Sequence, residues 1–490
     1  MDVTMFQMGF GESILIHQDD SCLLVDCGSE SKHSNEYFDD VVKELEKYTK
    51  RSLLISHFHE DHMNGVKYLY DHCTQGFDIV FLPNIFEKGN KALELLIVQH
   101  LKDLGTKKSE SYQLWQLLLN LIKAKNQVQL IQRGDDFVGS ACQFRALWPV
   151  NDNKKVVALW NQIEASANNI GFSLQQISEA ADWLRETMRW ITEDGDVAVK
   201  YSRAEEAVSA SFENFLNLRT RYIELISRKD EDAKRKTTQL QALFKKLKDN
   251  EHSIVFHTVD GHQLQVLMTG DATKESILDI ANNSVLPYIS IKDNYHVLKA
   301  PHHGTATHYC DLSPWFNYDR LLISNGETPK SSRGPIAEQY LLNGRAKHVY
   351  CTNTIRSRCE YMKKHNQCAD VCVDCKAGGV RVNCVMTQIS ATAKATVGWI
   401  AQNALKEILE GITDLSLINS LTEVEYSKRH FDMNYPILVR CRTKSKRRYY
   451  AKPLIIKGTE YYLCNEWRER NRHALLKWID EFTRVQEDEK

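Results

Sequence analysis

Short apolar runs separated by turn residues dominate the first third of the chain. Runs of this kind, bounded by glycine or polar residues, predict β-strands. The predicted strands are Val3–Met8, Ser13–Ile16, Cys22–Val25, Ser52–Ile55, Ile79–Leu82, Val128–Ile131 and Phe144–Trp148. Apolar residues at helical spacing predict helices at Asn35–Tyr48 and Leu114–Ile122. Strands that alternate with helices are typical of an α/β fold.

The pattern becomes helical between Asn153 and Asp249, a stretch without proline. Apolar residues recur there every three or four positions, which is the spacing of one helix face. Two such series are Leu174, Ile177, Ala181, Leu184, Met188, Ile191 and Val208, Phe212, Phe215, Leu218, Tyr222, Leu225. We predict an inserted helical hairpin or small bundle. Its expected role is that of a spacer, a dimerisation arm or a docking element for a partner protein.

Strand-like runs return after Asp249. The predicted strands are Ser253–His257, Gln263–Met268, His296–Ala300, Leu321–Ser324, His348–Cys351 and Gly379–Val382, with a helix at Thr273–Ala281. Beyond Cys384 a helix is predicted near Val397–Leu409, followed by a basic, aromatic segment. We therefore predict an α/β domain in two parts, residues 1–152 and 250–384. A helical insertion at 153–249 interrupts it, and a small basic domain at 385–490 follows.

Composition narrows the class of protein. The 490 residues suit more than one domain, and the formal net charge is −1. A balanced charge predicts no overall attraction to nucleic acid or anionic membranes, so such affinity must come from a local patch. No run reaches the roughly 18 apolar residues of a membrane helix, and Glu12 interrupts the N-terminus where a signal peptide would be apolar. With 13 cysteines, most of them expected to be buried thiols, the chain is predicted to be cytoplasmic.

The strongest chemical signal is the stretch His57–His62, with the sequence HFHEDH, directly after the apolar residues Leu53–Ile55. Alternate residues of an extended chain share a face, so His57 and His59 can hold one metal ion. Asp61 and His62, in the turn beyond, can reach a second ion about 3.5–4 Å away. Metal ions held in this way lower the pKa of bound water and make hydroxide available at neutral pH.

Other ligand-type residues also follow predicted strands. Asp271 comes after Gln265–Met268, where its carboxylate could bridge two metal ions, and His302 and His303 come after Val297–Ala300. Asp26 follows another strand, and we predict that it hydrogen-bonds a ligand histidine. Each of these signals is weak alone, but together they predict one metal site at the strand ends.

These motifs resemble the metallo-β-lactamase superfamily, and most closely the domain attached to competence-type DNA-uptake channels. The matching stretches are Phe6–Ile16, Leu24–Gly28, Ser56–Gly65, Asn250–Phe256, Met268–Asp271 and Leu298–Thr305. The resemblance implies an αββα metallo-β-lactamase sandwich that hydrolyses phosphodiesters, thioesters or lactones. It also implies that His57 and His59 bind the first metal, that Asp61 and His62 bind the second, and that Asp271 bridges them. One or two zinc ions, with manganese as the alternative, are the implied cofactors.

Two positions depart from the family pattern. Members often have a third first-site histidine after the strand that here ends at Trp148, whose indole cannot bind a metal. That site would then have three protein ligands or borrow His252. A later Gly-His-Pro is replaced by Arg333-Gly334-Pro335, so the second site's last ligand falls to His302 or His303. We predict His302 as the ligand and His303 as a phosphate-side donor or general acid.

Two further clusters follow. Cys359, Cys368, Cys372 and Cys375 could hold a structural zinc ion, although their spacing is irregular, and free or buried thiols are the alternative. Between Lys428 and His473, 13 Lys and Arg residues stand against four Asp and Glu residues. Cations with interleaved tyrosines suit nucleic acid, and a solvated hairpin is the competing interpretation. The predicted nucleic-acid contacts are Arg442, Lys444, Lys446, Arg447 and Arg448.

Three functions remain in competition. The first is a metal-dependent phosphodiesterase, specifically a nuclease, with Asp61 and His303 as catalytic residues and a polynucleotide held by the basic domain. The second is a hydrolase of a small phosphoester, cyclic nucleotide or lactone. The third is an effector or binding subunit in which Trp148 marks a degenerate metal site. The intact HFHEDH motif and Asp271 argue against the third, because a decaying site need not keep its ligands.

Overall fold

The computed structural model is a mixed α/β protein that divides into two compact units. The larger unit is Met5–Lys376, and the smaller combines Met1–Thr4 with Ala377–Lys490. The structure describes residues 1–31, 33–106, 113–139, 142–150, 154–228, 230–244, 252–259, 264–283, 291–292, 294–326, 334–342, 346–353, 359–366, 379–383, 389–390, 397–411, 415–441, 448–450, 452–471, 474–475 and 477–479.

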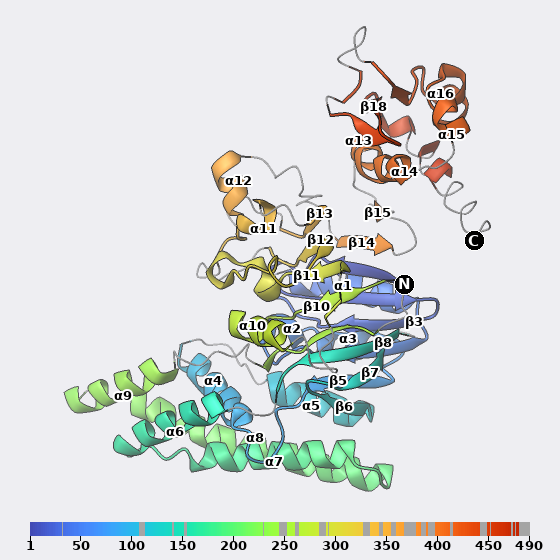
Figure 1. Cartoon of the computed structure of the whole chain (residues 1–490). Helices are drawn as coiled ribbons and strands as arrows, with labels where there is room; N and C mark the ends of the chain where they lie inside the picture. The colour runs from blue at the N-terminus through green and yellow to red at the C-terminus, as the bar shows by residue number, and fades with distance from the viewer. Residues whose placement is uncertain are drawn as a thin grey trace. The chain divides into compact units, whose positions relative to one another are not determined.

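The first sheet of the larger unit holds five neighbouring strands (Figure 1). In spatial order they are β2 (Ile14–Gln18), β3 (Ser21–Val25), β4 (Lys50–Leu54), β5 (Ile79–Pro83) and β6 (Gln127–Ile131). β2 and β3 form an antiparallel hairpin, and β3 to β6 run parallel. β1 (Asp2–Phe6) precedes them, and the boundary between the two units falls within it. The predicted strands of this region all overlap observed ones.

The second sheet combines strands from before and after the helical stretch. Its order is β13 (His348–Cys351), β12 (Tyr318–Ile323), β11 (Tyr295–Lys299), β10 (Val266–Met268), β9 (Val255–Thr258), β8 (Cys142–Trp148), β7 (Asp136–Gly139). β10 to β13 are parallel, and β7 to β10 are antiparallel. The two predicted parts of the α/β domain therefore share one sheet.

Strand residues pack on both faces of the first sheet. Leu53 and Val80 lie in one core with Phe38 of α1, whereas Phe81 faces the second sheet, with its ring centroid 4.9 Å from that of Phe137. The helices before the helical stretch are α1 (Ser34–Leu45), α2 (Glu60–Met63), α3 (Val66–His72), α4 (Ala92–Thr106) and α5 (Gln113–Ala124). Burial of apolar surface on both faces, at about 25 cal/mol per Å², stabilises this sheet.

A second core lies against the other sheet. Ile277 of α10 packs there with Leu298 of β11 and Leu321 of β12. The helices of this region are α10 (Lys274–Asn282), η2 (Pro301–Gly304), η3 (Ala306–His308), α11 (Gln339–Leu342) and α12 (Glu360–His365). The predicted helix at Thr273–Ala281 is α10, with Thr273 as its N-cap.

The stretch 153–249 is helical, as its apolar spacing predicts. It forms α6 (Lys154–Asn169), α7 (Gln175–Thr192), α8 (Val197–Ser227) and α9 (Glu231–Phe244). These helices share a continuous core with the first sheet's helices. Trp115 of α5 donates to Ser211 Oγ and stacks on Phe215, both in α8, and Arg185 of α7 pairs with buried Glu94 of α4. The stretch is thus tied by apolar and charged contacts to the layer beside it.

The smaller unit has its own core, built around Phe431, Trp467 and Trp478. Its strands are β14 (Gly379–Asn383), β15 (Ile389–Ser390), β16 (Leu438–Val439), β17 (Leu454–Ile456) and β18 (Thr459–Leu463). Its helices are α13 (Val397–Ile400), the π-helical η5 (Ala401–Leu405), α14 (Lys406–Gly411), α15 (Leu415–Ser420), α16 (Val424–Phe431) and η6 (Glu469–Asn471). The strands β16, β18 and β17 form a small antiparallel sheet.

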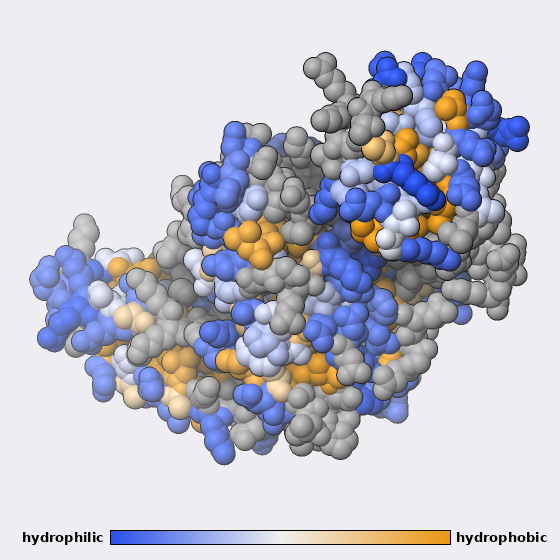
Figure 2. Space-filling model, turned by 45° about the horizontal axis from the view of Figure 1, so that its top comes forward, coloured by the Kyte–Doolittle hydropathy of each residue, from blue (hydrophilic) through white to orange (hydrophobic). Residues whose placement is uncertain are grey.

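Hydrophilic side chains cover much of the face seen in Figure 2, and apolar side chains form patches between them. Among the described helices, none is long and apolar enough to cross a membrane. Most of the described cysteines are buried, in keeping with their predicted role as small apolar residues.

Candidate metal centre

The predicted ligands lie at the carboxyl ends of parallel strands. In the first sheet, Asp26 follows β3 and His57–His62 follows β4. In the second sheet, Asp271 follows β10 and the pair His302–His303 follows β11. Because parallel neighbours end at the same edge of a sheet, each sheet presents its ligands together, and such edges are common binding sites in α/β proteins.

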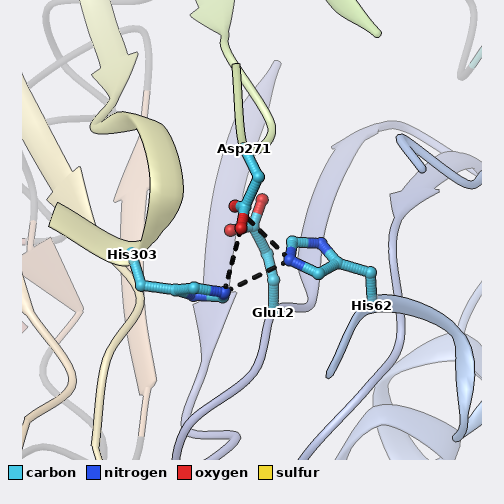
Figure 3. Close-up of side chains that lie close together, drawn as sticks. All are labelled: Glu12, His62, Asp271 and His303. Carbon is cyan, nitrogen blue, oxygen red and sulfur yellow. Dashed lines mark hydrogen bonds and ion pairs between the residues drawn. The ribbon is translucent and has the colours of Figure 1, made fainter. Parts of the chain in front are cut away.

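Four buried side chains converge between these strand ends: Glu12, His62, Asp271 and His303 (Figure 3). One ligand atom of each lies within 4.8 Å of the others. His62 Nε2 is 3.2 Å from His303 Nε2 and 3.4 Å from Asp271 Oδ1. His303 Nε2 is 3.5 Å from Asp271 Oδ2. Glu12 is absent from the sequence-predicted ligands, because a single carboxylate after a glycine has no ligand spacing to recognise.

Both histidines of this group have their other ring nitrogen engaged away from the centre. His62 Nδ1 lies 2.7 Å from Asp26 Oδ2, and His303 Nδ1 lies 2.9 Å from the carbonyl oxygen of Ser324. A partner at Nδ1 fixes the orientation of the ring and directs Nε2 toward the centre. This is the arrangement that metal-binding histidines have in proteins.

The remaining residues of the motif lie beside this group. Asp61 Oδ2 is 3.3 Å from His303 Nε2. His57 Nε2 is 2.9 Å from His59 Nδ1, and the His57 ring centroid is 4.1 Å from that of His62. The two halves of the HFHEDH motif therefore form adjoining clusters.

His302 and His303 occupy different places. His303 belongs to the tight group of four, whereas His302 reaches Asp271 from beside it, with 3.3 Å between Nδ1 and Oδ2. The ring of His302 also packs on that of His308, with 3.7 Å between centroids. Both residues have left-handed backbone, with φ of 52° and 56°. Such a conformation costs about 1–3 kcal/mol per residue, and strain of this kind clusters at functional sites.

Asp26 links the group around His62 to the pair His57 and His59. It is fully buried, with a left-handed φ of 59°. Its Oδ1 accepts from the Ser56 backbone N–H, and its Oδ2 accepts from Ser56 Oγ and lies against His62. Ser56 Oγ is in turn 3.0 Å from His57 Nδ1. One carboxylate thereby orients His62 directly and His57 through a serine.

The backbone below the site is packed without room for side chains. Glu12 N–H donates to the carbonyl oxygens of Gly28 and Asp61, and Cys27 N–H donates to that of His62. A Cβ on Gly28 would lie 2.3 Å from the carbonyl carbon of Asp61 and from the amide nitrogen of His62. Because Gly28 has no side chain, the loop His57–His62, called the metal-ligand loop below, can pack directly against the backbone that follows β3.

Charge and burial act on the site's pKa values in opposite directions. Burial opposes protonation of His62, but the carboxylates of Asp271 and Asp26 outweigh it and hold the pKa of His62 well above its ordinary value. Burial lowers the pKa of His57 well below its ordinary value, and His62 and His59 lower it further. Burial would raise the pKa of Asp271, yet the surrounding cations hold that pKa well below its usual range.

Metal binding at pH 7 is expected to release a proton from His62. The carboxylates of Asp271 and Asp26 hold the pKa of His62 above its ordinary value, which favours the protonated ring in the metal-free protein, and a metal-ligating imidazole must give that proton up. Affinity should therefore fall as the pH is lowered. Titration calorimetry in buffers of different ionisation enthalpy should give binding enthalpies that differ with the buffer. Buffer-independent enthalpies at pH 7 would contradict this assignment.

Trp148, at the end of β8, occupies the position of the absent third histidine. Its indole packs against the second core, and the guanidinium of Arg133 lies over the ring, 4.8 Å from the centroid. Arg133 also donates to the Leu147 carbonyl and pairs with Asp279 of α10. This position therefore serves packing, and it supplies no ligand.

Most residues of the two other predicted clusters lie outside the described part of the chain. These are Cys368, Cys372 and Cys375, and Arg442, Lys444, Lys446 and Arg447. Cys359 is buried at the start of α12. The Arg448 guanidinium lies over the Tyr435 ring, 4.2 Å from its centroid. The structural zinc ion and the nucleic-acid contacts stay predictions.

Comparisons with known proteins give a partial match. A model of the family described as anti-Pycsar protein Apyc1 matches residues 4–103, the segment that holds Glu12, Asp26 and His57–His62. Among solved structures, the chain is similar to the metallo-β-lactamase fold protein YhfI from Bacillus subtilis. The sequence identity is 11% and the TM-score 0.28, over 66% of this chain and 85% of that chain. No curated protein matches.

Proposed function

We propose that this chain is a metal-dependent phosphodiesterase of the metallo-β-lactamase superfamily. The observation that carries the proposal is the convergence of His62, Asp271 and His303 from the strand ends of two sheets, with Asp61 beside them. Imidazole and carboxylate ligands of this kind suit Zn²⁺, and Mn²⁺ accepts the same donors. A divalent cation there would supply Lewis-acid stabilisation of a phosphate oxygen and a nucleophile at neutral pH.

The proposed tight position uses Asp61, His62, Asp271 and His303. This reverses the sequence-based preference for His302, because His303 Nε2 faces the group while its Nδ1 is bound outward. His302 then lies at the side of Asp271, and His57 and His59 form a second candidate position that lacks the third histidine. We propose that this second position binds a cation more weakly than the first.

Cyclic nucleotides are the proposed substrates. The segment matched by the anti-Pycsar family model contains the whole HFHEDH motif, and that family points to degradation of cyclic nucleotides. A cyclic nucleotide is a phosphodiester, so it uses the same chemistry as a polynucleotide and needs no extended basic surface. The near-zero net charge of the chain agrees with a small substrate.

A panel of substrates tests whether the protein prefers cyclic nucleotides or polynucleotides. The metal-loaded protein is incubated with cyclic mononucleotides, single- and double-stranded DNA, RNA and a generic aryl phosphodiester, and products are separated by chromatography. We expect linear nucleoside monophosphates from the cyclic substrates at a rate well above that for any polymer. Faster cleavage of DNA or RNA than of every cyclic nucleotide would instead identify a nuclease.

Nuclease activity is the second candidate function, because the segment from Lys428 to His473 is rich in Lys and Arg. It makes a separate prediction. If the substrate is a polynucleotide, a fivefold change to Gln should weaken its binding and flatten the salt dependence. The slope of log affinity against log salt should fall by roughly 0.7–0.9 for each phosphate group that the variant no longer neutralises. The changed residues are Arg442, Lys444, Lys446, Arg447 and Arg448. Turnover of a small diester should stay the same, because it contacts only the metal centre.

A matched control removes the same amount of charge elsewhere. The control changes to Gln five exposed cations of the larger unit, namely Lys43, Lys67, Arg203, Lys234 and Arg235. Binding is measured by fluorescence anisotropy over a range of salt. If the segment variant and the control weaken nucleic-acid binding equally, the segment is no specific clamp.

A further inference from the structure

Lys299 is a buried cation that the ligand set leaves unexplained. It is the last residue of β11 and is completely shielded from solvent. Lysine is almost never fully buried unless its ammonium group is paired. Here the ammonium lies against three oxygen atoms. It lies 2.5 Å from Glu12 Oε2, 2.7 Å from the Gly270 carbonyl oxygen and 3.4 Å from Asp271 Oδ1.

The partners of Lys299 connect it to both halves of the metal centre. Asp271 is the proposed metal-binding carboxylate, and Gly270 is the residue before it. Glu12 is tied by its backbone N–H to the carbonyl oxygen of Asp61. A continuous path of polar contacts therefore runs from the Asp61 loop through Glu12 and Lys299 to Asp271.

The same contacts orient the Asp271 carboxylate. Its Oδ1 faces Lys299 Nζ and His62 Nε2, at 3.4 Å each. Its Oδ2 faces His302 Nδ1 at 3.3 Å and His303 Nε2 at 3.5 Å. The ammonium group of Lys299 therefore holds one oxygen of Asp271 in place, while the other oxygen faces the two histidines.

We propose that Glu12 and Lys299 are positioning residues, which act through Asp271 and the Asp61 loop to set the affinity of the centre for its metal ion. Glu12 lies in the group of four, yet its carboxylate serves Lys299 and is no ligand. This inference rests on the proposed metal centre.

A purely structural ion pair would behave differently. Replacing a buried pair by neutral side chains of similar volume is often neutral for stability, whereas removing one partner leaves an unpaired buried charge. The double variant Glu12→Gln/Lys299→Met removes both charges. If the pair served the fold alone, this variant would keep wild-type stability and wild-type metal affinity. If the pair positions Asp271, stability returns but affinity does not.

The experiment measures zinc affinity by competition with a chelating dye, and thermal unfolding of the metal-free protein. We expect Lys299→Met and Glu12→Gln to unfold at lower temperature than the double variant. In the double variant zinc affinity should be about 10–100-fold below that of the wild type, the usual effect of removing an outer partner of a metal ligand. Wild-type affinity in the double variant overturns the proposal. Loss of one bound zinc ion per chain in Glu12→Gln, with the ion retained in Lys299→Met, would make Glu12 a ligand and also overturn it.

Two further variants keep the test decisive. Glu12→Asp retains both charges, and so the fold, but shortens the reach to Lys299; its zinc affinity should fall, and an unchanged value contradicts the proposal. Glu94→Gln/Arg185→Met removes another buried pair, between α4 and α7, and should leave zinc affinity unchanged. A wild-type protein that binds no zinc or manganese would instead reject the metal centre itself.

Discussion

Replacing Asp61 with Ala is expected to lower phosphodiester hydrolysis by about 10³-fold, or ~4 kcal/mol of transition-state stabilisation. Asp61 is almost fully buried, and its carboxylate faces His303 Nε2 in the proposed metal position. The fold should persist, because the site brings several carboxylates together and removing one relieves repulsion in the metal-free protein. Steady-state kinetics measure the loss of turnover, metal analysis measures the bound ion, and circular dichroism checks that the variant is folded. A variant that is inactive because it is unfolded would make Asp61 a structural residue.

Glu60 offers a control from the same loop. It precedes Asp61, carries the same charge, is partly exposed and is not one of the proposed ligands. Glu60→Ala should retain turnover within a few-fold of the wild type and bind the same amount of metal. Equal loss in Glu60→Ala and Asp61→Ala would show that loop charge, and not a specific ligand, supports activity.

Gly28→Ala is expected to disrupt the centre through the backbone. The new Cβ would lie 2.3 Å from backbone atoms of Asp61 and His62, and neither can rotate away as a side chain could. Overpacking typically costs about 1–3 kcal/mol, and a backbone clash falls at or above the upper end of that range. We expect a lower unfolding temperature and a loss of zinc affinity, measured by scanning calorimetry and dye competition.

Gly76→Ala is the matched control. A Cβ there meets no atom within 4 Å, and Gly76 has no left-handed φ. Alanine at such a site should be neutral or stabilise the protein by about 0.4–1 kcal/mol. A Gly28→Ala protein with the stability and zinc affinity of the wild type would contradict the described packing of the metal-ligand loop.

The sequence pointed to the candidate metal site because its signals were local. His57–His62 and Asp271 each follow a recognisable apolar strand, and strand ends that meet at a sheet edge need no knowledge of the rest of the fold. The helix periodicity of the stretch 153–249 was equally local, since every third or fourth residue there is apolar. The choice between His302 and His303 was not local, because both rings reach Asp271 and only the folded chain shows that His303 joins the buried group of four.

Long-range contacts set the remaining features. Lys299 and Glu12 are 287 positions apart, and neither spacing nor composition pairs them. The sequence shows only that Glu12 and Lys299 are each a single charge in an apolar stretch. Such a charge predicts a buried partner but does not identify it. The packing of α8 against Trp115 likewise depends on which helix face meets which neighbour, a choice that amphipathic spacing leaves open.

Metal-dependent turnover of a generic aryl phosphodiester tests the central claim most directly. The protein is assayed as purified, after removal of metal by a chelator, and after reloading with Zn²⁺ or Mn²⁺, with metal content measured in each state. We predict that the chelated protein is inactive while still folded, and that either ion restores hydrolysis. A folded protein that binds the metal yet hydrolyses no phosphodiester, or one whose hydrolysis is unaffected by chelation, would contradict the account.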